Sequence, residues 1–161
     1  MMTRIPESAS RVLELLAQAP DRIRTSTRAV SWEQLSRRSK DEPWSIYDIL
    51  AHLRACTDVW GKHIYVMIEK DRPVQRHVSP RSYMRRPAYT MPDMDTALEL
   101  YTVERRKLLK TLSALDGSGW ARRGTFTGIS ERGRSQTVLS YAERLCNHEQ
   151  VHLDQIDSLL K

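Results

Sequence analysis

Four long segments of the sequence carry apolar residues in steps of three and four, which is the spacing of one side of an α-helix. Residues that start or stop helices bound these segments, such as Ser45 with Asp48 three residues later, or Asp116-Gly117. Amphipathic helices bury their apolar sides against one another, so the sequence predicts an all-α four-helix bundle. The segments cover about 7–28, 45–70, 92–115 and 137 nearly to the C-terminus, with a short helical turn over 31–37.

The chain is long enough for one domain with its own core, and neither an internal repeat nor a low-complexity tail divides its 161 residues. We therefore expect a single domain over residues 1–161. The apolar runs are short and broken by charge, so no membrane segment is expected. No leader-like pattern precedes Ile5, and the two cysteines form no disulfide framework, which indicates a cytoplasmic protein.

A formal net charge of +6 raises the question of an anionic partner. Much of this charge falls in two irregular stretches that lack the groove-entering helix and the interleaved aromatics of nucleic-acid readers, although Tyr83 and Tyr89 lie in the first. Nucleic acid is therefore not the expected partner. Two interpretations of these basic residues remain: they form a solvated surface, or they bind the carboxylates of a small molecule. The stretches comprise Lys70, Arg72, Arg76, Arg81, Arg85 and Arg86, and then Arg122, Arg123, Arg132 and Arg134.

Histidines interrupt the apolar side of two predicted helices. His148 and His152 are four residues apart, so their rings project from the same face about 6 Å apart. His52 lies on the apolar side of the second helix and is the expected third member of the group. His63 lies about 16 Å farther along that helix and cannot share an ion with His52, so it is the weaker candidate. His77, in the first basic stretch, is at most a substrate contact.

Together, His52, His148 and His152 are predicted to bind one divalent metal ion. Three neutral imidazoles leave a position open to water or substrate, which is typical of a catalytic site. Zinc or nickel is favoured, with iron or manganese as alternatives, because imidazoles suit several metals. Two other interpretations remain: the histidines are satisfied core residues, or Cys56 or Cys146 supplies a sulfur ligand instead of packing in the core.

The letters His148-Glu149-Gln150-Val151-His152 also match the H-E-x-x-H pattern of metalloprotease helices, in which the glutamate is the general base. That pattern needs a third ligand, which usually lies downstream, and no histidine follows His152. Glu149 projects about 100° away from His148 around the helix. Glu149 is therefore expected to flank the site or to contact a metal-binding residue on the side away from the metal. No residue is assigned as catalytic.

Several short motifs carry a resemblance when they are taken in order: Trp44-Ser45-Ile46, Ala51-His52-Leu53, the connection over residues 120–128, and the run over residues 148–156. With this spacing the chain resembles the DinB/YfiT-like metalloenzymes, a DNA-damage-inducible family distinct from the similarly named polymerase. The likeness covers nearly the whole chain. It implies a four-helix bundle, often dimeric, in which His52, His148 and His152 hold a divalent metal. It also implies metal-dependent transfer or isomerisation chemistry with low-molecular-weight thiols, or hydrolysis.

The depths of the histidines in their helices predict the topology. His52 lies about seven residues into the second helix, and His152 lies about nine residues before the end of the fourth. These depths match if the two helices are antiparallel, which requires the second and third helices to be parallel. A connection of roughly twenty residues after Lys70 is long enough for that crossover. We therefore expect the order up-down-down-up, with a long irregular connection between the second and third helices.

These observations leave three classes of function. The first is an enzyme in which the metal binds a thiol and holds it as thiolate for attack on an electrophile, with metal-dependent hydrolysis as its alternative. The second is a stress-related binding protein whose basic stretches engage nucleic acid. The third is a scaffold that forms a homodimer through an outer apolar face at Trp32 or Trp60.

Overall fold

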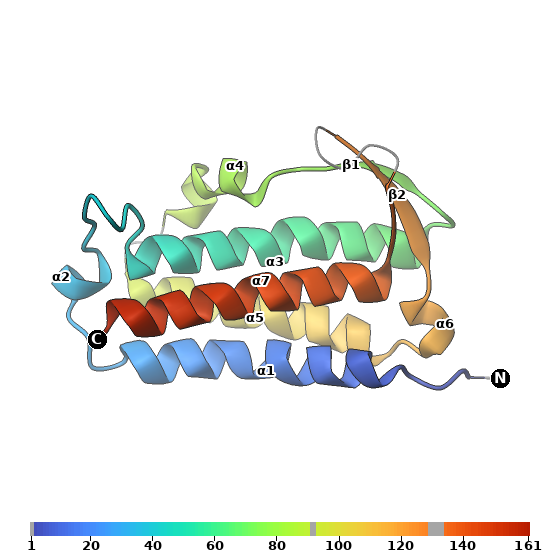
Figure 1. Ribbon diagram of the computed structural model, residues 1–161, viewed down its shortest axis with the longest axis horizontal. Helices are drawn as coiled ribbons and strands as arrows, with labels where there is room; N and C mark the ends of the chain where they lie inside the picture. The colour runs from blue at the N-terminus through green and yellow to red at the C-terminus, as the bar shows by residue number, and fades with distance from the viewer. Residues whose placement is uncertain (1, 91–92, 129–133) are drawn as a thin grey trace.

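Four long helices packed side by side form the body of the molecule (Figure 1). The computed structural model describes residues 2–90, 93–128 and 134–161. The four-helix bundle predicted from the sequence is confirmed, and the third helix begins at Met94 because Asp93 caps it. Pro92, where that helix was expected to begin, lies outside the described residues. The long helices are α1 (Glu7–Thr27), α3 (Ile46–Glu69), α5 (Met94–Ser113) and α7 (Val138–Leu159).

Side-chain caps determine where the two histidine-bearing helices begin. The hydroxyl of Ser45 accepts a hydrogen bond from the Asp48 amide, and the Asp48 carboxylate accepts one from the Ser45 amide, which completes the predicted capping box. Thr137 and Ser140 form the equivalent reciprocal pair at the start of α7. These bonds satisfy amides of the first turn that have no partner within the helix.

The four helices contact one another in the cyclic order α1, α5, α3, α7. Figure 1 shows the chain running one way through α1 and α7 and the opposite way through α3 and α5, which is the order up, down, down, up. Parallel α3 and α5 require the chain to return along the bundle between them. That return contains β1 (Val74–Arg76), the short helix α4 (Pro80–Met84) and the 3-10 helix η1 (Pro87–Tyr89), so it is less irregular than predicted.

A small sheet packs at one end of the bundle, and the expectation of an all-α chain missed it (Figure 1). Strand β2 (Arg123–Thr127) pairs in parallel with β1 and antiparallel with β3 (Arg134–Thr137). These strands are three to five residues long and consist mostly of polar residues, so their sequences look like loops. Phe126 is fully buried against the core. A Cβ atom at Gly124 would lie 2.9 Å from Cγ of Met67, so the close approach of β2 to α3 requires a glycine.

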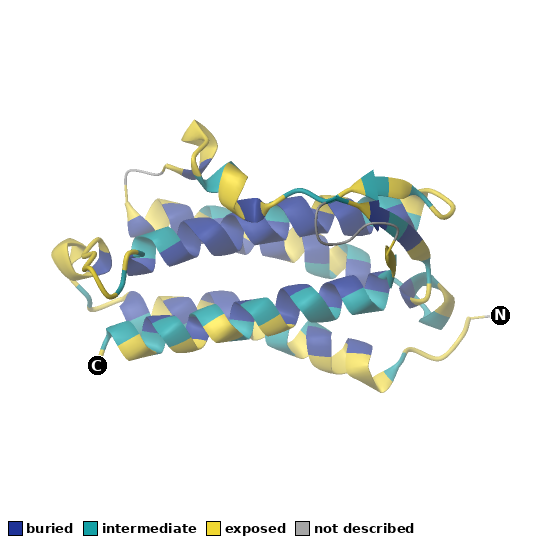
Figure 2. Cartoon of the chain, turned by 45° about the horizontal axis from the view of Figure 1, so that its top comes forward, coloured by how far each residue is buried: buried dark blue, intermediate teal, exposed yellow. Residues whose placement is uncertain are grey.

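A band of polar side chains divides the core into two apolar halves. On α3, Leu53 belongs to one half and Cys56 to the other, while on α7 the boundary falls between Cys146 and Leu153. Figure 2 shows the buried residues following the inner sides of all four helices. We call the side chains at this boundary the polar layer. It consists of His52, Thr57, Arg105, His148, Glu149 and His152, which are buried or half-buried.

Two short helices complete the described fold, α2 (Trp32–Leu35) and α6 (Gly117–Trp120). Trp32 is 49% exposed and contacts the Tyr47 ring edge-on. Trp60 is 4% exposed and belongs to the core, so it cannot form the outer apolar face that the dimer hypothesis gave it. Within the described part of the chain, every helix is too short or too polar to cross a membrane.

Candidate metal centre

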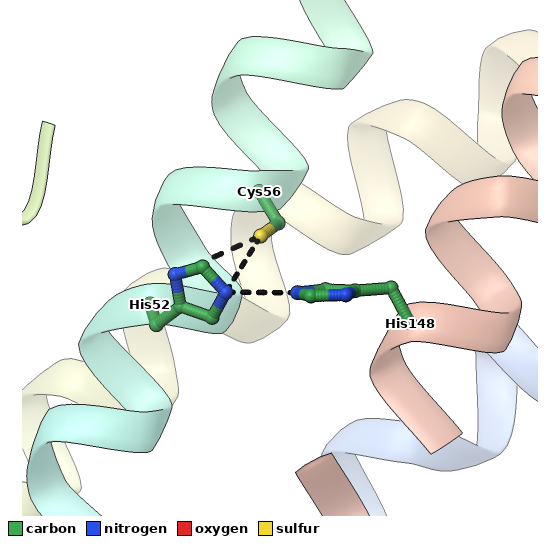
Figure 3. Close-up of side chains that lie close together, drawn as sticks. All are labelled: His52, Cys56 and His148. Carbon is green, nitrogen blue, oxygen red and sulfur yellow. Dashed lines mark hydrogen bonds between the residues drawn. The ribbon is translucent and has the colours of Figure 1, made fainter. Parts of the chain in front are cut away.

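Three histidines from two helices meet in the polar layer. The Nε2 atom of His52 lies 2.8 Å from Nε2 of His148, which in turn lies 3.2 Å from Nε2 of His152. Figure 3 shows the rings of His52 on α3 and His148 on α7 meeting through these nitrogens. The structure thus brings together the three residues that the sequence indicated as ligands.

The spacing of these nitrogens suits a single metal ion. Zinc binds imidazole nitrogen at about 2.0–2.1 Å, so two nitrogens on one ion lie roughly 2.9–3.4 Å apart at the usual coordination angles. The two observed separations are close to that range. Hydrogen bonds fit less well, because Nε2 of His148 carries either one proton or one lone pair and cannot complete bonds to both neighbours. A cation beside Nε2 of His148 would remove this conflict, because every neutral imidazole can offer it a lone pair.

Two side chains, Gln155 and Glu42, form a hydrogen-bonded series that orients the ring of His152. Nδ1 of His152 lies 2.9 Å from Oε1 of Gln155, so Nδ1–H donates to that oxygen and the Nε2 lone pair points to the other histidines. The Gln155 amide in turn donates to Oε2 of Glu42 at 3.3 Å. Such contacts from behind fix the tautomer of a ligand histidine. The i,i+3 spacing of His152 and Gln155 could have indicated this pair from the sequence.

The surroundings of the cluster keep its imidazoles neutral. Burial, together with the charges that His152 and His148 would carry, lowers the pKa of His52 to about 3. Burial and the neighbouring charges of His152 and Arg144 lower the pKa of His148 to about 4. Burial also lowers the pKa of His152, although its bond to Gln155 acts in the opposite direction. Neutral rings are the form that binds a metal.

Two tryptophans form walls beside the histidines. The ring of Trp44, just before α3, lies 4.9 Å from the ring of His52 and 6.0 Å from that of His152. The ring of Trp60 lies 5.2 Å from that of His148. These apolar surfaces limit the access of water to the cluster.

The side chain of Cys56 lies directly beside the histidine cluster. Its Sγ atom is 3.5 Å from Nε2 of His52 (Figure 3), and potential ligand atoms of His52, Cys56 and His148 lie within 4.8 Å of one another. Burial raises the pKa of the Cys56 thiol, which favours the protonated form. Cys56 is fully buried in the apolar core as well, so it is both a packing residue and a neighbour of the centre.

Glu149 points away from the histidines. Its two carboxylate oxygens accept hydrogen bonds from Nη1 and Nη2 of Arg105 at 2.7 and 2.5 Å, and the Tyr101 hydroxyl also donates to it. Burial disfavours the charge of Arg105, but the Glu149 carboxylate raises its pKa above the usual value. Arg105 also donates to Thr57 Oγ1 and to the Leu16 carbonyl, so this ion pair links all four long helices. The carboxylate is therefore not placed as the general base of an H-E-x-x-H site.

The remaining histidines lie outside the cluster. His63 is buried farther along α3, where Nδ1 lies 2.9 Å from Oε1 of Gln75 and the ring contacts those of Phe126 and Tyr141 edge-on. His77 follows β1, and its backbone amide donates to the Thr127 carbonyl. These positions agree with the weaker roles that the sequence indicated for both residues.

The two basic stretches have several structural roles. Arg122 donates to the carbonyls of Met67 and Lys70 at the end of α3, and Arg86 stacks on the ring of Tyr83. Arg81 stands apart, with its guanidinium 5.2 Å from the centre of the Trp44 ring. Arg132, counted in the second stretch, lies outside the described residues.

Comparison with known proteins agrees with this architecture. The chain is similar in structure to YfiT from Bacillus subtilis, which is described as a probable metal-dependent hydrolase with an unusual four-helix bundle topology. The likeness has a TM-score of 0.82 at 15% sequence identity and covers 96% of this chain and 87% of that chain. No curated protein matches the sequence. The profile of the DinB superfamily matches residues 15–156, and the chain therefore belongs to that superfamily.

Proposed function

We propose that this protein is a metal-dependent enzyme whose divalent ion is held by His52, His148 and His152. The convergence of the three Nε2 atoms, with separations of 2.8 and 3.2 Å, carries this proposal. Zinc or nickel is the favoured ion, with iron or manganese as alternatives. Three protein ligands leave one coordination position of the ion open to a small-molecule substrate.

The residues around the ion would have separate tasks. A divalent ion at this position supplies Lewis-acid chemistry that lowers the pKa of a bound nucleophile. Gln155, held by Glu42, keeps the lone pair of His152 directed to the centre. Trp44 and Trp60 exclude bulk water from either side, which strengthens electrostatic interactions inside the site.

Transfer of a low-molecular-weight thiol to an electrophile is the favoured reaction. The thiol sulfur would form a bond to the electrophilic carbon, the leaving group would depart with its electron pair, and the thiol proton would pass to solvent. A free thiol has a pKa of about 8.5, so it needs little activation and no dedicated base. Because Glu149 is bound to Arg105, the glutamate that would activate water in an H-E-x-x-H site is not in position.

Metal-dependent hydrolysis is the second candidate, and the description of YfiT as a probable metal-dependent hydrolase favours it. An ion in a three-histidine site can lower the pKa of water to about 7 without a carboxylate base. Hydrolysis therefore needs the same histidines and differs from thiol transfer in the nucleophile.

One pair of assays separates the two reactions. The zinc-loaded protein is incubated with a panel of low-molecular-weight thiols and a bimane electrophile, and separately with nitrophenyl esters. We expect thiol transfer that His148→Ala/His152→Ala abolishes and that Arg106→Gln, which changes an exposed residue on α5 away from the cluster, retains. Ester hydrolysis with no thiol transfer would select the second candidate. Metal binding without either activity would leave the protein with a metal site and contradict the enzyme proposal.

A homodimer is a further proposal, with Trp32 as its remaining apolar contact because Trp60 is buried. Sedimentation of the wild type beside Trp32→Ser tests it. A dimer that the substitution dissociates is expected, whereas a monomeric wild type would overturn this proposal without affecting the metal site.

A further inference from the structure

The two basic stretches of the sequence meet at one end of the bundle. Lys70 and Arg72 lie in the turn that follows α3, and Arg123 begins β2. The Thr125 amide donates to the Pro73 carbonyl at 2.8 Å, and the parallel pairing of β1 with β2 continues this contact. Figure 1 shows α3, β2 and α6 coming together at this end. Residues about fifty positions apart in the sequence therefore form one basic surface.

A cavity of about 240 Å³ opens in this surface. Its volume is below the range of sites for drug-sized ligands, so it suits a small chemical group. The lining is mostly polar, with Asp71 as the one acid among the described residues that line it. We call it the basic pocket, after its four basic side chains, Lys70, Arg72, Arg122 and Arg123.

Arg122 is held in place in the wall of the basic pocket. The side chain is half-buried, and its Nε and Nη2 atoms donate to the carbonyls of Met67 and Lys70 at 2.8 and 2.9 Å. A guanidinium has five N–H donors in a planar fork, so these two bonds leave further donors for a ligand. Arg122 therefore offers a positive charge whose position is already fixed before a ligand binds, which lowers the entropic cost of binding.

The backbone at Arg72 is strained. Within the part of the chain that the structure describes, Arg72 is the one non-glycine residue with a positive φ, at 42°. Side chains larger than hydrogen seldom adopt this conformation, and strain of this kind is concentrated at functional sites such as ligand clamps. The strained residue lies in the turn between α3 and β1, and its side chain lines the basic pocket.

The positive charges of the basic pocket are not neutralised by neighbouring acids. Lys70, Arg72 and Arg123 are exposed, and none of them forms an ion pair with a described acidic residue. Asp71 offsets a single charge of the four. A phosphate group carries close to two negative charges and several acceptor oxygens, whereas a carboxylate carries one charge and two oxygens. Several converging cations therefore match a phosphate better than a carboxylate.

We infer that the basic pocket binds a phosphate group, either free phosphate or the phosphate of a small molecule. The pocket is a second site, separate from the metal centre. The end of α3 at Glu69 lies about 25 Å from His52 by the helical rise, so one small ligand cannot reach both. The inference goes beyond the proposed function and does not depend on a bound metal.

Isothermal titration calorimetry at about pH 8 and constant ionic strength tests the preference for phosphate, which is mostly a dianion there. The probes are inorganic phosphate, glycerol phosphate and acetate. We expect the better of the two phosphate ligands to bind at least about tenfold more tightly than acetate, because it makes more charge-assisted contacts. Tighter binding of glycerol phosphate than of inorganic phosphate would identify the ligand as a phosphate ester, and the reverse order would identify it as the free anion.

Charge variants test the location of the site. Arg72→Gln and Arg123→Gln should each weaken phosphate binding about five- to tenfold. Arg28→Gln is the matched control, because it removes the same charge from an exposed position after α1, at the other end of the bundle. Asp71→Asn should strengthen phosphate binding, because it removes a like charge from the pocket. A general disruption of the surface would not produce this opposite effect.

Other outcomes would overturn the inference and leave the metal site untouched. His148→Ala/His152→Ala should retain phosphate binding; loss in this variant, with normal binding in both arginine variants, would place the phosphate at the metal centre. No detectable phosphate binding, equal affinity for acetate, or unchanged affinity in both arginine variants would contradict a phosphate site in the basic pocket. A DNA duplex that binds more tightly than both phosphate ligands, and that the same arginine variants weaken, would make the pocket part of a nucleic-acid surface instead.

Discussion

The carboxylate of Glu149 binds both terminal nitrogens of Arg105 inside the bundle, although Glu149 follows directly after His148 in the sequence. Neighbouring residues on one helix point about 100° apart, so α7 directs His148 to α3 and Glu149 to α5. The polar layer therefore holds two separate groups, the histidine cluster and a buried ion pair. The first is suited to chemistry, and the second joins all four long helices through Arg105.

Glu149→Gln is expected to destabilise the fold. Leaving the buried charge of Arg105 without its carboxylate should lower the free energy of unfolding by about 3 to 5 kcal/mol, measured by urea denaturation. The double substitution Arg105→Met/Glu149→Leu removes both charges and should recover most of that loss. If Glu149→Gln instead kept its stability and lost activity in an enzyme assay, Glu149 would be acting in catalysis.

Gln155→Leu is expected to weaken metal binding while leaving the fold intact. Without the acceptor at Nδ1 the ring of His152 can rotate or change tautomer, so the affinity for zinc should fall about 10- to 100-fold in a chelator competition. Gln150→Leu is the matched control, because Gln150 lies on the same helix but contacts Arg22. Equal affinities for the two variants would show that Gln155 does not orient the ligand.

Much of the site is readable from the sequence because it follows helical spacing. His148 and His152 share a face through their four-residue separation, and His52 lies on the apolar side of its own helix. The partner of Glu149 was not predictable, because Arg105 lies among charged neighbours on α5 and looks like a surface residue. The sheet was missed for a related reason: β1, β2 and β3 are short, and only Phe126 and Gly124 are buried in β2. Both features depend on tertiary contacts between segments distant in sequence.

The metal-free protein should lose stability in mild acid. The pKa of His52 is about 3 and that of His148 about 4 in the folded state, below the ordinary value of 6.5, so the unfolded chain binds more protons between these values. The free energy of unfolding should therefore fall as the pH decreases from 6.5 towards 4. His52→Leu/His148→Leu should show a shallower fall over the same interval when both proteins are unfolded with urea. An identical pH dependence of the free energy of unfolding in the two proteins would show that burial does not lower the pKa values of these histidines.

Cys56 gives a direct test of which side chains bind the ion. If the three histidines are the ligands, the cobalt-loaded protein should lack a thiolate-to-cobalt charge-transfer band in its absorption spectrum, and Cys56→Ser should keep its metal stoichiometry. A charge-transfer band that disappears in Cys56→Ser would place the sulfur, 3.5 Å from Nε2 of His52, in the ligand set.

Metal content of protein purified without an affinity tag, compared with His148→Ala/His152→Ala, tests the central claim most directly. The account predicts about one divalent ion per chain in the wild type and none in the double variant, which should remain folded by circular dichroism. A wild type that stays metal-free after incubation with zinc, nickel or manganese, or a double variant that still binds one ion per chain, would contradict it.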